Sequence, residues 1–197
     1  MKTNKILMGD ARAALAGKWK TAVLTTLVYF LIVIVVSSIP KAGRLINFII
    51  SGPLLLGWAM FWLSLSRGNN PELEMIFSGF KSFGKALGLY CLMALFIILW
   101  ALLFIIPGIL AALSYSMAFY ILADNKDIGV LEAIRKSKAM MYGRRWKLVC
   151  LSFRFFGWFL LSMLTAGIGF LWFAPYTKVA MVKFYDDIKN ITPEPQA

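Results

Sequence analysis

The chain has 197 residues, of which 60% are hydrophobic and only 15% charged, and its mean hydropathy is +0.76. Soluble domains average about 45–50% apolar and about 25% charged residues, so this composition excludes an ordinary soluble domain and predicts an all-α polytopic membrane protein. The net charge is +12, but the Lys and Arg residues flank the apolar stretches, so we expect no nucleic-acid partner. Histidine is absent. Because it is the commonest metal ligand and general base, the sequence predicts no metal site and no cofactor.

The first apolar stretch follows a basic N-terminus. It runs from Thr21 to Val36 and resembles the apolar part of a signal peptide, but no small-x-small cleavage site follows it. We therefore expect a first transmembrane span over about 21–39 that stays in the protein. A turn-like linker at 40–44 then leads into a second span over about 45–65.

The next apolar stretch is too long for a single crossing of the bilayer, which takes about 20 residues. It runs from about Leu87 to Ile106, meets Pro107-Gly108 and resumes over 109–123. Proline lacks the amide N–H and disfavours helix in the residue before it. Pro107-Gly108 is therefore either the tip of a hairpin, which we favour, or a break within one helix.

The last third of the chain predicts one more hairpin. A fifth span covers about 148–165, a tip lies at 166–169, and a sixth span ends near Tyr185. About six transmembrane helices thus form three hairpins in a single membrane domain over residues 1–191. The tail at 192–197 is polar and Pro-rich, and we expect it to be disordered.

The segments before the hairpins are amphipathic. Asn70-Pro71-Glu72 is a strong helix start, and from Glu72 to Lys85 the apolar side chains, with Phe77 and Phe80 among them, fall on one helical face. This pattern predicts a helix that lies on the membrane surface. A second such helix begins at Asp127, and the stretch around Leu7 is a weaker version.

The cations next to the spans predict the orientation. With a cytoplasmic N-terminus, the loops that fall inside carry most of the Lys and Arg residues, so the positive-inside rule places both termini in the cytoplasm of a bacterial inner membrane. Basic and aromatic side chains mark the expected membrane interface. These residues are Lys18, Trp19, Lys20, Phe77, Phe80, Arg144, Arg145, Trp146 and Lys147.

The same pattern indicates an internal repeat of three units, at 4–66, 70–124 and 127–186. Each unit has an amphipathic segment, a basic entry and a hairpin, and the return helices end in similar aromatic sequences. The alternative is that every membrane entry is basic and aromatic, without any repeat.

Several longer motifs carry a resemblance to a known family. They are Ile105-Ile106-Pro107-Gly108-Ile109, Tyr115–Asp124, Glu132–Ser137, Ser152-Phe153, Gly157-Trp158, Leu164–Gly169 and Pro175-Tyr176. The chain resembles, over nearly its whole length, the bacterial membrane family called domain of unknown function 975. That family is similar to the membrane domain beside some glycerophosphodiester phosphodiesterases. The resemblance implies a multi-span bacterial membrane protein and no particular activity. Arg154 departs from the pattern, where an apolar residue is expected.

The sequence offers little catalytic chemistry. All acidic residues map to the expected cytoplasmic face, and Asp186-Asp187 has no further carboxylate or histidine nearby in sequence to complete a cation site. Ser and Thr nucleophiles have no histidine partner. We therefore expect no enzyme, but a non-catalytic membrane module with a scaffold, regulatory or lipid-interacting role. The alternative is a membrane component of a transporter or exporter.

One anion site is predicted within the spans. Arg154 and Lys178 each lie about eight residues inside the membrane boundary of the last two spans, at nearly the same depth and without an acidic side chain at that depth. They either extend separately to the headgroups or share a phospholipid phosphate or small anion. The expected partners are thus anionic lipid headgroups and a membrane protein whose identity the sequence does not give.

Overall fold

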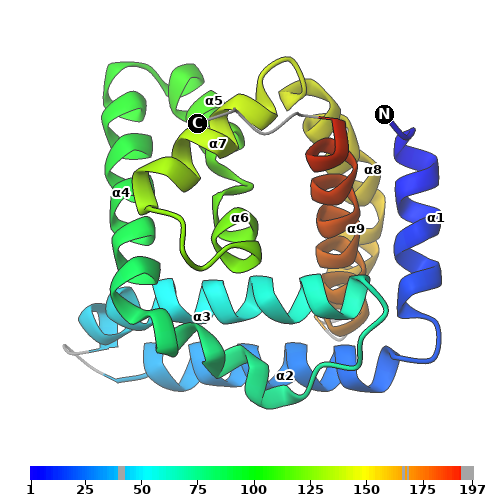
Figure 1. Ribbon diagram of the computed structural model, residues 1–197. Coiled ribbons are helices and arrows are strands. Elements are labelled where there is room, and N and C mark those ends of the chain that lie inside the picture. The colour runs from blue at the N-terminus through cyan, green and yellow to red at the C-terminus, as the bar shows by residue number, and fades with distance from the viewer. Residues whose placement is uncertain (40–42, 166, 168, 192–197) are drawn as a thin grey trace.

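The computed structural model describes residues 1–39, 43–165, 167 and 169–191, and over these residues the protein is all-helical (Figure 1). The predicted fold class is confirmed to that extent. The linker at 40–42, part of the 166–169 tip and the tail at 192–197 lie outside the described residues. The elements in chain order are α1 (Asn4–Leu15), α2 (Trp19–Ser37), α3 (Gly43–Ser66), the 3-10 helix η1 (Leu73–Ser82), α4 (Phe83–Leu103), α5 (Ile105–Tyr115), α6 (Ala118–Asp124), α7 (Val130–Met141), α8 (Arg145–Leu164) and α9 (Phe170–Ile191).

The long helices form three antiparallel pairs, α2 with α3, α4 with α5, and α8 with α9. In each pair, residues near the turn contact each other, and residues further from the turn on one helix contact residues further from the turn on the other. The contacts, in that order, are Ser37–Asn47 and Tyr29–Trp58, Ala101–Gly108 and Phe96–Tyr115, and Phe159–Phe170 and Phe155–Tyr176. The second helix of each pair is called its return helix below.

The turn between α4 and α5 lies at Phe104, whose backbone is extended. Pro107 falls in the first turn of α5, where the missing N–H has no partner to lose. Gly108 lets the two helices approach closely, because a Cβ there would lie 2.8 Å from the Cα of Ala101. The Pro-Gly sequence therefore follows the chain reversal by three residues and does not form the tip itself.

Each hairpin is buried at its base and exposed at its apolar tip. The buried core collects residues from the bases, such as Trp62, Leu122 and Phe184. The tips expose large apolar side chains, with Leu102 82% and Leu164 88% exposed. By length and composition, five helical stretches of the described chain could cross a membrane. The sixth expected span, in α9, is not among them and contains charged residues from Lys178 to Asp187.

Residues 73–82 form a 3-10 helix and not the expected α-helix. A 3-10 helix has three residues per turn, so side chains three apart align. Ile76 and Gly79 accordingly lie on a buried row, whereas Phe77, Phe80 and Phe83 lie on an exposed row. The predicted apolar face is thus divided, with one row against the protein and an aromatic row outside.

Glycines bring η1 into backbone contact with α3. A Cβ on Gly57 would lie 1.7 Å from the carbonyl oxygen of Ile76, and one on Gly79 would lie 2.0 Å from that of Pro53. Real Cβ atoms do not approach so closely, so only glycine fits at either position. This packing fixes η1 along α3, with the aromatic row facing away.

The segment that precedes each hairpin, which is α1, η1 or α7, is called its leading segment below. Two of the three leading segments end in the same kind of turn. Helices α1 and α7 each have 12 residues and end at a residue with φ near −60° and ψ 127°, Ala16 and Tyr142. Each is followed by a glycine of positive φ, 76° at Gly17 and 71° at Gly143. The middle segment, η1, runs directly into α4 without such a turn. The threefold repeat stays a prediction, with matching local geometry in its first and third units.

Each leading segment packs on the return helix of another hairpin, so the three hairpins are linked in a ring. Each contact of a leading segment with such a return helix is called a boundary of the ring below. η1 packs on α3, α7 on α5 and α1 on α9. A 12-residue helix is about 18 Å long. The hairpins that follow α1 and α7 therefore each begin one helix length further along the neighbouring return helix. In Figure 1, α2 and α3 accordingly run across the view, whereas α4, α8 and α9 run up it. The three hairpins therefore do not share one direction.

Candidate functional site

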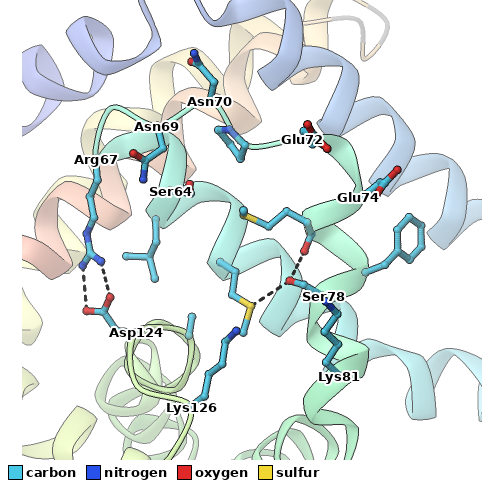
Figure 2. Close-up of a pocket in the computed structure, with 16 residues that line it drawn as sticks. Ser64, Arg67, Asn69, Asn70, Glu72, Glu74, Ser78, Lys81, Asp124 and Lys126 are labelled. Carbon is cyan, nitrogen blue, oxygen red and sulfur yellow. Dashed lines mark hydrogen bonds and ion pairs between the residues drawn. The ribbon is translucent and has the colours of Figure 1, made fainter.

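An ion-pair cluster joins the ends of the three return segments, which are α3, α5 with α6, and α9. The guanidinium of Arg67, just after α3, donates two hydrogen bonds to the carboxylate of Asp124, at 2.5 and 3.0 Å (Figure 2). Asp124 is the last residue of α6, and its side chain is 12% exposed. The hydrogen bond to Asp124 raises the pKa of Arg67 above its ordinary value.

Helix α9 completes this cluster. Asp186 accepts a hydrogen bond from Arg67 at 2.8 Å, and Lys189 donates to Asp124 at 2.6 Å. The hydroxyl of Tyr185 lies 3.1 Å from the same carboxylate. The base cluster, defined as these five residues, therefore holds α3, α6 and α9 together with alternating charges.

The sequence contained a signal for the base cluster that the motif search missed. Arg67, Asp124 and Asp186 each follow the aromatic end of a return segment within five positions, after Trp62, Tyr120 and Tyr185. The distance from the aromatic residue differs among the three predicted repeat units, but the charges are complementary. The pairing itself is long-range, so no local pattern predicts it.

The two adjacent aspartates, Asp186 and Asp187, bind different partners. Asp187 accepts from the backbone N–H of Lys2 at 3.1 Å and lies 3.5 Å from the Lys147 ammonium. Asp186 is paired with Arg67. In the part of the chain that the structure describes, no group of three or more His, Cys, Asp or Glu residues could hold a metal ion.

A cavity of about 900 Å³ opens beside the base cluster, between the end of α3, η1 and the end of α6. Its walls carry both signs of charge, from Arg67, Lys81 and Lys126 and from Glu72 and Glu74. Figure 2 shows the glutamates on the side away from the Arg67–Asp124 pair. Acidic and basic side chains therefore share the lining of this cavity.

Arg154 and Lys178 do not line the same cavity in the structure. Lys178 lines a cavity of about 470 Å³ together with Ser152, Phe156 and Phe159. Arg154 is exposed and is not among the residues that line this cavity. Neither residue forms an ion pair with another described residue. The shared anion site stays a prediction.

The predicted interface residues lie at several different places. Lys18 donates to the carbonyl oxygens of Gly68 and Asn69, and Arg144 to that of Met140. Lys147 contacts Lys2 and Asp187 at the base, whereas Lys20 and Trp146 are exposed. Trp19 shares a cavity with Thr165, and Arg145 shares one with Pro107. Phe77 and Phe80 lie on the exposed row of η1.

Comparison with known proteins gives one family. No curated protein and no solved structure matches the chain. A family described as "Protein of unknown function (DUF975)" matches residues 1–114 and 102–192. The family resemblance predicted from the motifs is thereby confirmed, whereas the likeness to the membrane domain of glycerophosphodiester phosphodiesterases stays a prediction. The chain belongs to this family of proteins of unknown function.

Proposed function

We propose that this protein is an integral protein of the bacterial inner membrane and acts there as a non-catalytic module with a scaffold, regulatory or lipid-interacting role. The division of every hairpin into a buried base and an exposed apolar tip carries the proposal. Burying a large apolar side chain is worth about 1.5–3 kcal/mol. Tips of this size would be unfavourable in water, and lipid tails would cover them.

The charges support an orientation with both termini in the cytoplasm. The bases of the hairpins carry ion pairs, such as Lys147 with Asp187 and Arg67 with Asp124. The linkers expected outside carry only Lys41 and Arg44. This asymmetry is what the positive-inside rule requires. The exposed aromatic row of Phe77 and Phe80 in η1 and Phe83 at the start of α4 supports an additional contact with the membrane interface.

A role without catalysis is supported by the state of the acids. Asp124, Asp186 and Asp187 are held in ion pairs that join helices, which is the arrangement of a structural cluster. A module of this kind acts through what it binds, either lipid or another membrane protein.

One experiment tests the membrane assignment, and a second tests the role. After alkaline carbonate extraction, the protein should remain with the membrane pellet, and its release into the supernatant would overturn the assignment. The full chain, solubilised from native membranes, should then carry a stoichiometric protein partner or retained lipid.

The alternative role is transport, and the cavity of about 900 Å³ favours it. Purified protein in liposomes should show no protein-dependent flux of small solutes if the module is non-catalytic and non-transporting. Flux that Ser78→Trp, in the wall of this cavity, abolishes would favour the transporter and overturn the module.

A further inference from the structure

A small cavity at the start of α8 is lined by two cations. It has a volume of about 220 Å³ and is lined by Lys138 and Arg145, by Ser114 and Tyr115, and by Trp100 and Leu110. None of its lining residues is acidic. Three separate elements, α4–α5, α7 and α8, therefore enclose a site of purely positive formal charge.

The backbone around this cavity is held firmly. Ser137 is fully buried, donates to the carbonyl oxygen of Ser114 at 2.7 Å and accepts from the N–H of Met117 at 3.2 Å. These bonds fix α7 against the junction of α5 and α6, and Figure 1 shows α5 and α7 side by side. Lys138, the next residue, is thus presented to the cavity from a fixed helix.

The cations lack partners of their own. Neither Lys138 nor Arg145 forms an ion pair within the described chain. The Nε of Arg145 is buried and makes no hydrogen bond to any described residue. A buried donor left unpaired is unfavourable, and more so when it belongs to a charged group. Arg145 is also the first residue of α8, and a helix N-terminus favours an anion there.

An equivalent cavity recurs at another boundary of the ring. The cavity of about 370 Å³ between α1–α2 and α8–α9 is lined by Arg12 and Trp19, which lie 126 positions before Lys138 and Arg145. On the opposite wall, residues in the two cavities differ by 62 positions. These pairs are Pro107 and Gly169, Leu110 and Trp172, Ala111 and Phe173, and Ser114 and Tyr176.

At the third boundary of the ring, between η1 and α3, the equivalent positions are packed too closely for such a cavity. Counted from Gly84, which corresponds to Gly17 and Gly143, the equivalent positions are Gly79 and Ala86. A Cβ on Gly79 would lie 2.0 Å from the Pro53 carbonyl oxygen, and one on Gly52 would lie 2.7 Å from that of Ala86. Small residues therefore close this boundary, whereas long cationic side chains line the cavity at α8.

Apolar surface adjoins the cavity at α8. Trp100 and Leu110 at its wall are half exposed, and Ile106 and Ile109 on α5 are 71% and 56% exposed. An anion bound here would thus have an apolar strip beside it, which matches a headgroup phosphate with acyl chains. We propose that Arg145 and Lys138 bind the phosphate of an anionic phospholipid whose chains lie along α5. This inference rests on the proposed membrane location.

Native mass spectrometry of the full chain in detergent with added phosphatidylglycerol tests the site. Contact of anionic lipid with one Lys or Arg is worth about 1 kcal/mol, or about fivefold in retention. Arg145→Gln and Lys138→Gln should each weaken retention of one lipid about fivefold, and Arg145→Lys should keep part of it. Arg135→Gln, an exposed cation of α7 outside the cavity, is the matched control and should change nothing.

Two further probes separate the sources of the anion. Diacylglycerol has the same chains without phosphate, and equal retention of it would overturn the phosphate contact. Inorganic phosphate that displaces the lipid fully at equal concentration would overturn the choice of a lipid. Equal losses in the Arg135 and Arg145 variants would overturn the site. Because carbonate extraction of the Arg145 variant should be unchanged, failure of the site is distinguishable from failure of the membrane assignment.

Discussion

Arg67 and Asp124 lie 57 positions apart in sequence and form a bidentate ion pair with N–O distances of 2.5 and 3.0 Å. The pair joins the end of α3 to the end of α6, and Asp186 and Lys189 extend it to α9. It is the point at which the return segments of the three predicted repeat units meet.

Replacing Asp124 should therefore loosen the base of the molecule. Asp124→Asn removes the charge that Arg67 and Lys189 share, and we expect a loss of about 1–3 kcal/mol in the free energy of unfolding. Thermal unfolding of detergent-solubilised protein measures it. Glu132→Gln is the control, because the Lys136–Glu132 pair is a single, partly exposed i,i+4 contact worth about 0.3–0.5 kcal/mol. Equal effects of the two variants would contradict a structural role for the cluster.

Gly79 should tolerate no side chain. Gly79→Ala places a Cβ 2.0 Å from the carbonyl oxygen of Pro53, so η1 must move away from α3, at a cost of about 1–3 kcal/mol or more. Gly84→Ala is the control, since no atom lies within 4 Å of a Cβ there and alanine favours the helix. The melting temperature should fall for the first variant and stay or rise for the second.

The aromatic row of η1 should give a depth profile with a period of three residues. A 3-10 helix over Leu73–Ser82 aligns Phe77 and Phe80. Spin labels placed singly along 72–85 in membranes should therefore lie deepest at every third position. A period of 3.6 would indicate the α-helix expected from the sequence, and a flat profile would exclude interfacial contact.

Both termini should be reached by reagents from the cytoplasm. Cysteines placed at Ala42 and Gln196, both outside the described residues, should label from opposite sides of the membrane, in a background with Cys91 and Cys150 replaced by serine. The charge asymmetry of the linkers is the reason. Labelling of both from the periplasm would refute the orientation.

Arg154 and Lys178 provide a separate test of the sequence-based anion site. If they share a lipid phosphate, Arg154→Leu and Lys178→Leu should each reduce retention of anionic lipid in native mass spectrometry to a similar extent. Unchanged retention in both variants would leave the two side chains extending separately to the headgroups. The lining of the Lys178 cavity, which does not include Arg154, makes this a demanding test.

The sequence by itself determined the helical class and the approximate places of most long helices. The apolar runs and the amphipathic stretch from Val130 to Met141 follow local periodicity, which needs no knowledge of neighbours. Repeated Gly-basic-aromatic entries at Gly17 and Gly143 also reflect local geometry, since a positive φ favours glycine.

Only the tertiary structure decided how these pieces face one another. The close packing of η1 on α3 depends on Gly57, which lies in a different helix from η1. The Arg67–Asp124 pair and the cavity of Lys138 and Arg145 likewise join residues from separate helices. Local periodicity shows which face of a helix is apolar, but the ring of helix contacts determines whether that face meets protein or the surroundings.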